Sequence, residues 1–305
     1  MTNILVTGGS GQIGSDLKLF KNINNQIFFF PSSSEVDITK IKSVNSFIKE
    51  NNIDLILNFA AYTKVDDAER EKNISKELNY IGPLNLAKIA SNNQIGVIHF
   101  STDYVFGKKQ SGINYSKSPV SPINYYGYTK ALGEKAILEN CNLGFVVRLA
   151  SVYGKFGENF IKTITRLILT NDSIKVVSDQ KISLTSSYDL SKNIKYLIDL
   201  YRKRLNSNER ILHFTNKGYT TWYKLANIVK EQVEINLDKK INTKIIPIKS
   251  NQWNSLAKRP SDSRLKVNFK EFELNNIFLP KWDVSVREFV DIILPKIIID
   301  LKNEQ

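Results

Sequence analysis

The chain has 305 residues, 42% of them hydrophobic, and carries a formal net charge of +13 at pH 7. That length can bury a sizeable core, in one large α/β domain or in two closely joined ones. No apolar run is long enough to span a membrane, so a membrane partner is not expected. The basic residues are scattered without a basic block, which argues against nucleic-acid binding and leaves a positive field suited to phosphorylated ligands.

Cysteine and histidine usage excludes two further classes of site. Cys141 is the only cysteine, so the chain holds no intrachain disulfide and gives no sign of an oxidising compartment. Met1–Asn3 lead directly into an apolar run with no basic region before it, and we expect a cytoplasmic protein. His99 and His213 are the only histidines and no cluster has metal-ligand spacing, so no metal is predicted. We expect His99, inside an apolar run, to be a packed core residue.

Near-continuous apolar runs alternate with helix-period segments in the first half of the chain. Strands without polar alternation are typical of a parallel sheet that is buried on both faces. Their alternation with helices predicts an α/β fold with a doubly wound, Rossmann-like parallel sheet. The runs indicate strands at 3–7, 26–30, 54–59, 96–100 and 143–149, and the segments between them indicate helices at 13–20, 41–49, 74–91 and 126–139.

The second half is less regular. Ser285 and Glu288 have the spacing of a capping box at the start of the last predicted helix, and Pro295 should end or kink that helix. We assign residues 1–155 to a dinucleotide-binding domain, to which the chain returns around 172–215. Residues 156–305 form mainly a smaller α/β substrate domain, expected to pack directly on the sheet. Helices are predicted at 158–169, 189–201, 221–233 and 285–293, and strands at 174–177, 211–214 and 244–248.

A glycine-rich loop follows the first predicted strand and opens the first predicted helix. Gly8, Gly11 and Gly14 allow a tight turn, close approach of the backbone to a pyrophosphate, and contact between helix and strand. The helix N-terminus then offers its N–H groups to the phosphates. A glycine triplet between a strand and a helix predicts a dinucleotide site, with NADPH or NADH as the cofactor.

The end of the second predicted strand lacks the acidic residue that usually holds the adenosine ribose. Ser32–Ser34 follow the strand, with neither a carboxylate nor an arginine at its tip. We therefore expect measurable binding of both cofactors, with NADPH favoured by the serine hydroxyls and the positive field. Asp37 either meets the adenine edge or caps the helix that follows, and the sequence leaves both interpretations open.

Tyr126 and Lys130 stand four residues apart on a predicted helix, so both side chains project from one face. An ordinary tyrosine has a pKa of about 10, and a nearby ammonium favours the phenolate and lowers that pKa. The strand before this helix ends in Thr102, whose hydroxyl can hold a carbonyl oxygen while Tyr126 gives it a proton. This combination predicts reduction of a ketone with hydride from a nicotinamide.

The glycine loop, residues 58–63, residues 101–106 and the Tyr126–Lys130 pair occur in the order typical of extended short-chain dehydrogenase/reductases. Within that superfamily the chain resembles, nearly end to end, the dTDP-4-dehydrorhamnose reductase family. The resemblance implies catalysis by Thr102, Tyr126 and Lys130. The cofactor-binding positions match Gly11, Gln12, Ile13, Asp37, Ile38, Ala60, Ala61, Tyr62 and Thr63, with Tyr126 and Lys130, and the substrate-facing positions match Val65, Thr102, Asp103 and Tyr104.

Two further features bear on the sugar nucleotide. Ser151 stands where the family often has a tryptophan near the sugar, so we expect a roomier pocket and leave the particular sugar open. Lys258, Arg259 and Arg264 gather around Pro260, and arginine forks suit phosphate oxygens. We therefore expect Arg259 to contact the diphosphate of the substrate.

The expected activity is NAD(P)H-dependent reduction of the C4 ketone of a nucleotide-diphospho 4-keto-6-deoxysugar, foremost dTDP-4-dehydro-L-rhamnose. Another sugar-nucleotide reductase or a 4-epimerase of the same superfamily is the first alternative. A non-catalytic NADP-binding subunit, like the regulatory subunit of methionine adenosyltransferase, is the alternative of another class. A dehydratase is disfavoured because Thr102-Asp103 is followed by Tyr104 instead of glutamate. The sequence leaves the oligomeric state open, with a homodimer as the candidate assembly.

Overall fold

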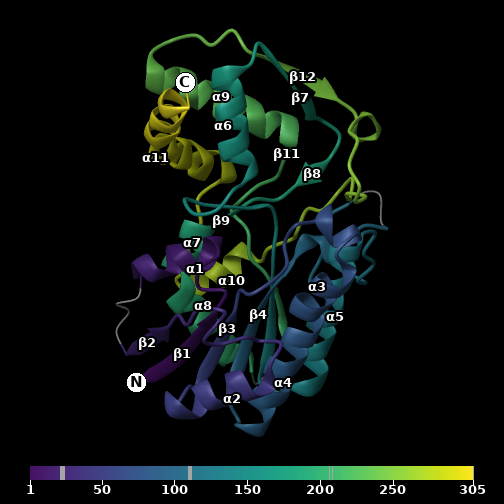
Figure 1. Cartoon of the computed structure of the whole chain (residues 1–305), viewed down its shortest axis with the longest axis vertical. Helices are drawn as coiled ribbons and strands as arrows, with labels where there is room; N and C mark the ends of the chain where they lie inside the picture. The colour runs from purple at the N-terminus through teal and green to yellow at the C-terminus, as the bar shows by residue number, and fades with distance from the viewer. Residues whose placement is uncertain (21–24, 109–111, 206, 208, 305) are drawn as a thin grey trace.

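A six-stranded parallel sheet forms the centre of the larger of two lobes in this computed structural model, which describes residues 1–20, 25–108, 112–205, 207 and 209–304 (Figure 1). The strand order is β10-β5-β4-β3-β1-β2, and every neighbouring pair is parallel. The predicted doubly wound parallel sheet is confirmed. Its strands are β1 (Thr2–Thr7), β2 (Gln26–Phe29), β3 (Leu55–Asn58), β4 (Gly96–Thr102), β5 (Gly144–Leu149) and β10 (Ile211–His213).

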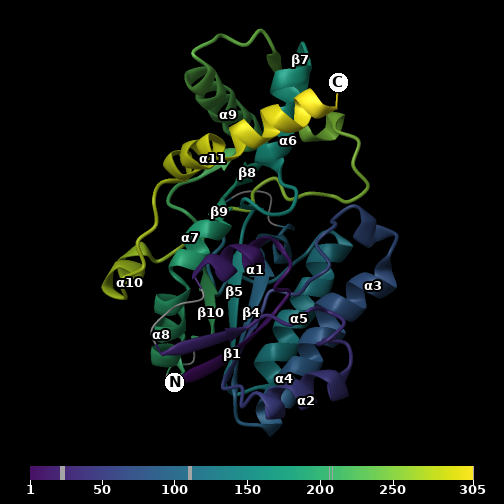
Figure 2. The same cartoon turned by 60° about the vertical axis from the view of Figure 1, so that its left-hand side comes forward.

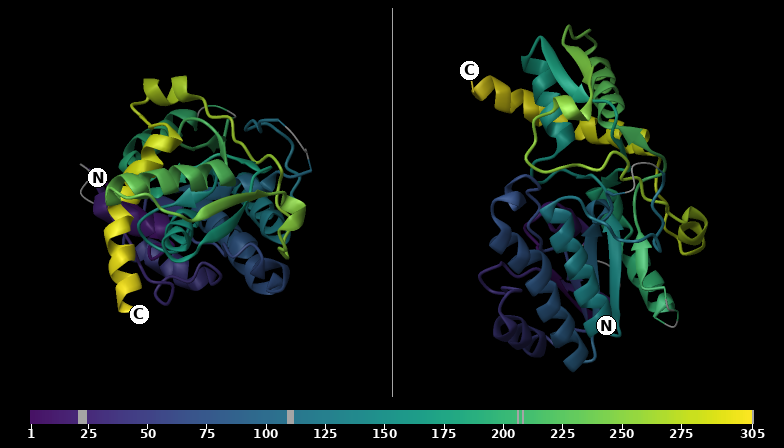
Figure 3. Two further views of the ribbon diagram at one scale, coloured as in Figure 1. Left: turned by 90° about the horizontal axis from the view of Figure 1, so that it is seen from above. Right: turned by 90° about the vertical axis from the view of Figure 1, so that its right-hand side faces the viewer.

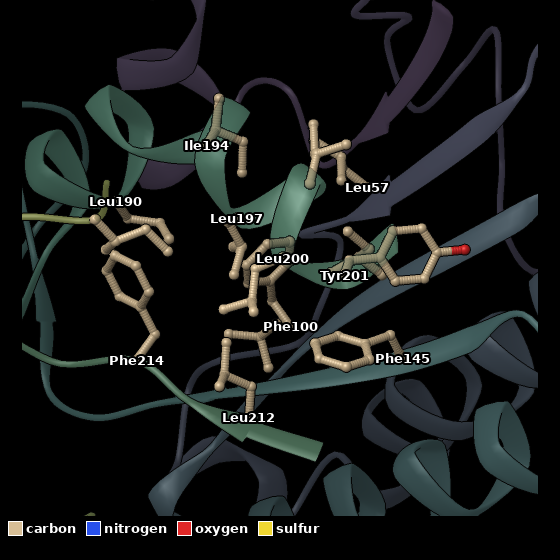
Figure 4. Packing of buried hydrophobic residues seen from close by; sticks show 14 of the residues in the cluster. Leu57, Phe100, Phe145, Leu190, Ile194, Leu197, Leu200, Tyr201, Leu212 and Phe214 are labelled. Atoms are coloured by element: carbon tan, nitrogen blue, oxygen red, sulfur yellow. The ribbon is translucent and has the colours of Figure 1, made fainter. Parts of the chain in front are cut away.

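Helices cover both faces of the sheet, and successive residues of a strand point alternately to the two layers. In β1, Ile4 and Val6 belong to one buried cluster, whereas Leu5 belongs to the other. Figure 4 shows the first cluster, where Phe100 and Phe145 from the strands lie near leucines of the covering helices. Burial on both faces explains why the strands lack polar alternation. One layer contains α1 (Gln12–Leu17), α7 (Ser187–Lys192), α8 (Ile194–Arg204) and α10 (Phe269–Leu274), and the other contains α2 (Ile41–Glu50), α4 (Gly82–Asn92) and α5 (Tyr125–Asn140).

The helix predicted at 74–91 is interrupted by a π-helical turn, η3 (Glu77–Ile81), between α3 (Lys72–Lys76) and α4. Such turns are frequent at functional sites. Within η3, the Asn79 side chain accepts a hydrogen bond from the Tyr62 N–H at 2.9 Å and donates one to the Tyr62 carbonyl at 3.0 Å. The turn therefore anchors the segment that follows β3, at the carboxyl edge of the sheet. Short 3-10 turns are η1 (Lys18–Phe20), η2 (Asp67–Glu69), η4 (Asp103–Val105) and η5 (Ser250–Gln252).

The smaller lobe lies over the carboxyl ends of the sheet strands and has a core of its own (Figures 2 and 3). Its three long helices bury residues such as Ile164, Val229 and Val290 against one another. The expectation that the second half packs directly on the sheet is therefore wrong for these helices, because their apolar stripes face each other; it holds for α7, α8 and α10. The lobe contains α6 (Phe160–Thr170), α9 (Trp222–Leu237), α11 (Trp282–Asn303) and a parallel pair, β7 (Ser173–Val177) with β12 (Lys244–Ile248).

Two further short pairs of strands lie outside the central sheet. They are β6 (Val152–Tyr153) with β9 (Thr185–Ser186), which is parallel, and β8 (Lys181–Ile182) with β11 (Thr220–Thr221), which is antiparallel. None of the helices within the described ranges is both long and apolar enough to cross a bilayer.

The C-terminal helix, α11, extends beyond its prediction at both ends. It begins at Trp282, and Ser285 lies inside it, donating its hydroxyl to Asp189 Oδ2 at 2.8 Å. The predicted capping box is therefore wrong. Pro295 lies within the helix and does not end it. Ile297 beyond it is 3% exposed in the small-lobe core, and such burial outweighs the loss of one N–H donor.

Candidate active site

A cleft of about 690 Å³ lies at the carboxyl ends of β1, β3 and β4, between the two lobes. It brings together most of the predicted site residues: Gly8, Gly11, Gln12, Ile13, Ala60, Ala61, Thr63, Val65, Thr102, Asp103, Tyr104, Tyr126 and Ser151. The lining does not include Gly14, Asp37, Ile38, Tyr62, Lys130 or Arg259. It also includes residues that the sequence analysis did not single out, among them Ser10, Phe59, Ser101, Glu158 and Trp222.

The glycine loop closes tightly between β1, β3 and α1. Gly8 has a φ of +73°, and a Cβ on it would lie 2.6 Å from the Ala60 nitrogen. A Cβ on Gly14 would lie 2.5 Å from the Gly8 carbonyl oxygen. Only hydrogen fits at these two positions, so the backbone of the loop packs closely at this end of the cleft. This arrangement fits the diphosphate of a dinucleotide at the point where the strand order of the sheet reverses.

Gln12 connects the glycine loop to the small lobe. Its Nε2 donates to the Val152 carbonyl at 3.2 Å, and its Oε1 accepts from Asn159 Nδ2 at 3.0 Å. Asn159 is also the N-cap of α6, where its Oδ1 accepts the Lys162 N–H at 3.2 Å. Besides the predicted cofactor contact, Gln12 thus links the two walls of the cleft.

The tip of β2 carries a carboxylate that the sequence analysis missed. Glu35 Oε2 accepts hydrogen bonds from the Ser32 N–H and the Ser32 hydroxyl, both at 2.7 Å. These bonds hold the pKa of Glu35 below its usual value. The Ser-x-x-Glu spacing of a capping box was the signal for this contact. The Ser32 hydroxyl, which we expected to favour NADPH, is therefore hydrogen-bonded to the Glu35 carboxylate.

Three residues matched to cofactor-binding positions have other partners. Asp37 Oδ1 accepts from the Thr39 N–H at 3.0 Å and from its hydroxyl at 2.7 Å, within a turn that precedes α2. The N-cap of α2 is Lys40, so the alternative that Asp37 caps this helix is wrong. Ile38 is 3% exposed in the core beneath α2 and α4. Tyr62 Oη donates to Glu71 Oε2 at 2.5 Å. Their contacts with a cofactor stay predictions.

Tyr126 is placed by the first turn of α5. Asn124 caps this helix through its Oδ1, which accepts the Gly127 N–H at 2.8 Å. Gly127 packs on the Tyr104 carbonyl, where any Cβ would collide. The ring of Tyr126 therefore lies edge-on to the ring of Tyr104, at 5.9 Å between centroids. Tyr126 is 9% exposed and presents its hydroxyl end beside Thr102 in the cleft.

The pKa shifts of Tyr126 and Lys130 differ from those expected from the sequence. Burial raises the pKa of Tyr126 to about 12, a shift that the Thr102 hydroxyl opposes. Burial lowers the pKa of Lys130 to about 8, and Glu134 opposes that shift. Lys130 Nζ donates to the Phe100 carbonyl at 2.7 Å, and among the described residues it has no hydrogen bond to Tyr126. The expectation that Lys130 lowers the pKa of Tyr126 is therefore wrong in this structure, because desolvation dominates.

Asp103 places a carboxyl group close enough to Tyr126 to influence its pKa. Its Oδ1 accepts from the Thr102 hydroxyl at 3.1 Å, and its Oδ2 has no well-aligned partner among the described residues. Burial raises the pKa of Asp103 to about 7, although hydroxyls of Ser263 and Thr102 oppose the shift. The group consequently changes charge near neutral pH, beside the predicted proton donor.

The cations expected to bind a diphosphate already have carboxylate partners. Arg259 Nη2 lies 2.6 Å from Asp66 Oδ2, and its Nη1 lies 3.2 Å from Asp66 Oδ1. Arg264 Nη2 lies 2.6 Å from Asp262 Oδ2. Arg259 thus ties the segment after β12 to the segment after β3. A phosphate contact of Arg259 would have to use a guanidinium group that already binds Asp66.

The wall opposite the tyrosine comes from the small lobe. Ser151 lines the cleft with a φ of +40°, in the left-handed region. Trp222, the first residue of α9, lines the same cleft and donates its Nε1–H to Gln180 Oε1 at 3.2 Å. Its ring packs against that of Phe160 in a tilted arrangement, with 4.6 Å between the centroids. Trp222 could not be singled out from the sequence, because nothing local places the start of α9 in the same cleft as Ser151. An aromatic side chain therefore bounds the space that Ser151 leaves.

The family described as RmlD substrate binding domain matches residues 1–294. The chain belongs to this family. It is 32% identical over 294 residues to dTDP-4-dehydrorhamnose reductase of Salmonella typhimurium, covering 94% of this chain and 97% of that protein. A solved dTDP-4-dehydrorhamnose reductase from Clostridium acetobutylicum has a TM-score of 0.86 at 31% identity, covering 96% of this chain and 100% of that one. The Bacillus anthracis reductase, solved in complex with NADP, has a TM-score of 0.83 at 32% identity, covering 95% and 99%.

Membership of the RmlD family confirms the resemblance that the motifs indicated. The match runs through both lobes, so the cleft between them belongs to the part of the chain that the family shares. The roles of the individual lining residues stay predictions.

Proposed function

We propose that this chain reduces the C4 ketone of dTDP-4-dehydro-L-rhamnose with NADPH or NADH, giving dTDP-L-rhamnose. One observation carries the proposal. A single cleft is lined by the glycine loop and by Thr102 with Tyr126, in a member of a family whose curated relatives include dTDP-4-dehydrorhamnose reductases.

The chain's own residues supply the proton and the polar contacts of the reaction. A bound nicotinamide supplies hydride to C4. Tyr126 stays protonated at neutral pH because burial raises its pKa to about 12, so its hydroxyl is a proton donor to the sugar O4. As negative charge develops on the same oxygen, the Thr102 hydroxyl gives up its bond to Asp103 Oδ1 and donates to that oxygen instead. Lys130, one helical turn beyond Tyr126, replaces the proton that the tyrosine loses.

The remaining walls orient the sugar nucleotide. Asp103 and Tyr104 contact the sugar hydroxyls, and Val65 covers the ring from the side of β3. Ser151 and Trp222 bound the side of the small lobe, and they limit the size of the sugar and its substituents. A ketone is required because Thr102 and Tyr126 polarise and protonate an oxygen but supply no base for elimination.

The test follows oxidation of NADPH and of NADH with 4-keto-6-deoxysugars that are made in situ as dTDP, UDP, GDP and CDP derivatives. We expect turnover with dTDP-4-dehydro-L-rhamnose and its conversion to dTDP-L-rhamnose by product analysis. Turnover confined to a GDP or CDP sugar would reject the rhamnose assignment and keep the reductase. Interconversion of 4-epimers without net cofactor oxidation would establish the epimerase instead.

The same assay separates enzyme from binding subunit. Cofactor binding without turnover on any sugar nucleotide would favour the non-catalytic regulatory subunit. Tyr126→Phe is the matched control, because it should abolish turnover and leave the glycine loop intact.

We also propose a cytoplasmic homodimer. The compartment follows from the charged cofactor and substrate, which do not cross membranes unaided. The assembly is supported by Ile292 and Ile299, each 58% exposed on α11. Light scattering during gel filtration tests it, since a monomer has a mass of 34.9 kDa.

A further inference from the structure

A buried polar chain joins the strand before the glycine loop to Lys130. The Thr7 hydroxyl donates to Asn58 Oδ1 at 2.7 Å, and Asn58 Nδ2 lies 2.9 Å from His99 Nδ1. His99 Nε2 lies 3.4 Å from Lys130 Nζ. None of the four residues is more than 3% exposed. The predicted burial of His99 is confirmed, but the imidazole has a polar neighbour at each nitrogen.

The orientation of the Asn58 amide is fixed by its backbone neighbour. The Ala60 N–H donates to Asn58 Oδ1 at 3.2 Å, and a backbone N–H can only donate. The amide nitrogen therefore faces His99, so His99 Nδ1 must accept and the proton of the neutral ring lies on Nε2. Burial and the charge of Lys130 hold the pKa of His99 well below its usual value, so the ring stays neutral.

The Nε2–H of His99 points at Lys130 Nζ. An ammonium has only donors and gains nothing from this contact, whereas a neutral amine accepts it with its lone pair. The bond from Lys130 Nζ to the Phe100 carbonyl is available to both forms. His99 therefore favours the amine, in the same direction as burial. Gly133 allows the approach, because a Cβ there would touch Nε2 at 3.4 Å and collide with the Asn79 carbonyl.

The other charged groups around Lys130 act differently. Glu134, one turn further along α5, favours the ammonium, but Arg148 of β5 binds both of its carboxylate oxygens, at 2.9 and 2.7 Å. Asp103, after β4, acts on Tyr126, whose pKa it helps to raise. No titratable group other than Lys130 faces His99 from β3 or α5, among the residues that the structure describes.

We propose that His99 is a positioning residue for proton delivery, which through its fixed tautomer holds Lys130 ready to release a proton to Tyr126. The inference rests on the proposed reduction. When Tyr126 gives its hydroxyl proton to the substrate oxygen, a phenolate remains. Because Lys130 Nζ has no direct hydrogen bond to Tyr126 among the described residues, one of its N–H protons reaches that phenolate through an intervening water. The resulting amine accepts the hydrogen bond from His99 Nε2–H. His99 itself loses no proton, and solvent restores the ammonium after the product leaves.

The tautomer is tested without any cofactor, by nitrogen-15 spectra of the imidazole rings. His99 and His213 are the only histidines, and His99→Phe assigns the signals. We expect His99 to have a protonated Nε2 and an unprotonated Nδ1. Asn58→Asp keeps an acceptor for Thr7 and replaces the amide nitrogen with oxygen, so the two ring nitrogens should exchange roles. A wild-type spectrum with a protonated Nδ1 would overturn the proposal.

The consequence is tested by the pH profile of kcat/KM for ketone reduction. Its alkaline limb reports loss of the Lys130 proton, and both Asn58→Asp and His99→Phe should move it upward by about one pH unit. Thr7→Val is the matched control. The Ala60 N–H still orients the Asn58 amide in this variant, so the alkaline limb should not move. An unmoved limb in both folded variants would show that His99 only packs. Wild-type protein without turnover would reject the proposed reduction, and the spectra would still decide the tautomer.

Discussion

At the scale of single residues, Tyr126 and Tyr128 form a natural pair for comparison. Tyr126 is 9% exposed in the cleft, whereas Tyr128 is 49% exposed on the surface of α5. Tyr126→Phe should lower kcat on the order of a hundredfold with little change in cofactor affinity, because only the proton donor is lost. Tyr128→Phe should leave both unchanged. Steady-state kinetics and cofactor titration measure this, and a greater loss in the Tyr128 variant would contradict the assignment.

We expect cofactor preference to depend on one carboxylate, Glu35, in the segment that follows β2. Glu35, bound to Ser32, would repel a 2′-phosphate and accept a hydrogen bond from a 2′-hydroxyl. We expect NADH to bind at least as tightly as NADPH. Glu35→Gln should shift the ratio of dissociation constants toward NADPH by about fivefold at low salt, as for one exposed charge. Glu50→Gln, at the end of α2, is the control, and a preference unaffected by Glu35→Gln would remove it from the ribose site.

Asp103 should make stability depend on pH. Its pKa rises from 3.8 to about 7 on folding because the carboxyl group is buried, so the folded protein holds the proton more tightly between these values. The stability contributed by this group is therefore full at low pH and lost as pH rises through that window. Asp103→Asn should raise Tm relative to wild type by about 2–4 °C at pH 8 and by less at pH 5. Thermal melts at both pH values measure this, and an equal effect at both would contradict it.

At the scale of elements, α11 continues through a proline because its apolar face is buried. Pro295 itself is exposed, so its ring contributes little to the core. Pro295→Ala restores an N–H inside the helix and should stabilise the protein by roughly 1 kcal/mol, less than the ~3 kcal/mol cost of proline in an ideal helix. Denaturant unfolding measures the change. Lys296→Ala, also exposed, should have little effect, and destabilisation by Pro295→Ala would mean that the helix needs its proline.

At the scale of the whole molecule, polar contacts join the segment after β12 to the segment after β3. The Arg259–Asp66 pair is one of them, and its side chains are 23% and 43% exposed. Pairs of this exposure contribute little to stability. Arg259→Ala should therefore lower Tm by no more than about 2 °C and raise the KM for the sugar nucleotide by roughly tenfold, as expected when a charged contact is lost. Lys258→Ala, the exposed neighbour, should change neither, and an equal effect on KM would assign the role to net charge.

The sequence by itself determined the features that depend on local order. Near-continuous apolar strands, a glycine loop directly after β1, and a Tyr-x-x-x-Lys pair after Thr102 required only periodicity and spacing, since each feature is complete within a few residues. These sufficed for the parallel sheet, the family and most of the cleft lining. Asp37 remained ambiguous at this level because both interpretations use the same carboxylate.

Only the tertiary structure decided contacts between segments that are distant in sequence. It separated the long helices of the small lobe from the sheet, placed Trp222 and Ser151 on one cleft, paired Arg259 with Asp66, and set His99 between Asn58 and Lys130. Charge and hydrogen bonding depend on which atoms meet and how much water remains, and spacing along a chain specifies neither. For that reason the sequence was enough to identify Tyr126 and Lys130 as candidates, whereas their pKa values depend on how deeply the fold buries them.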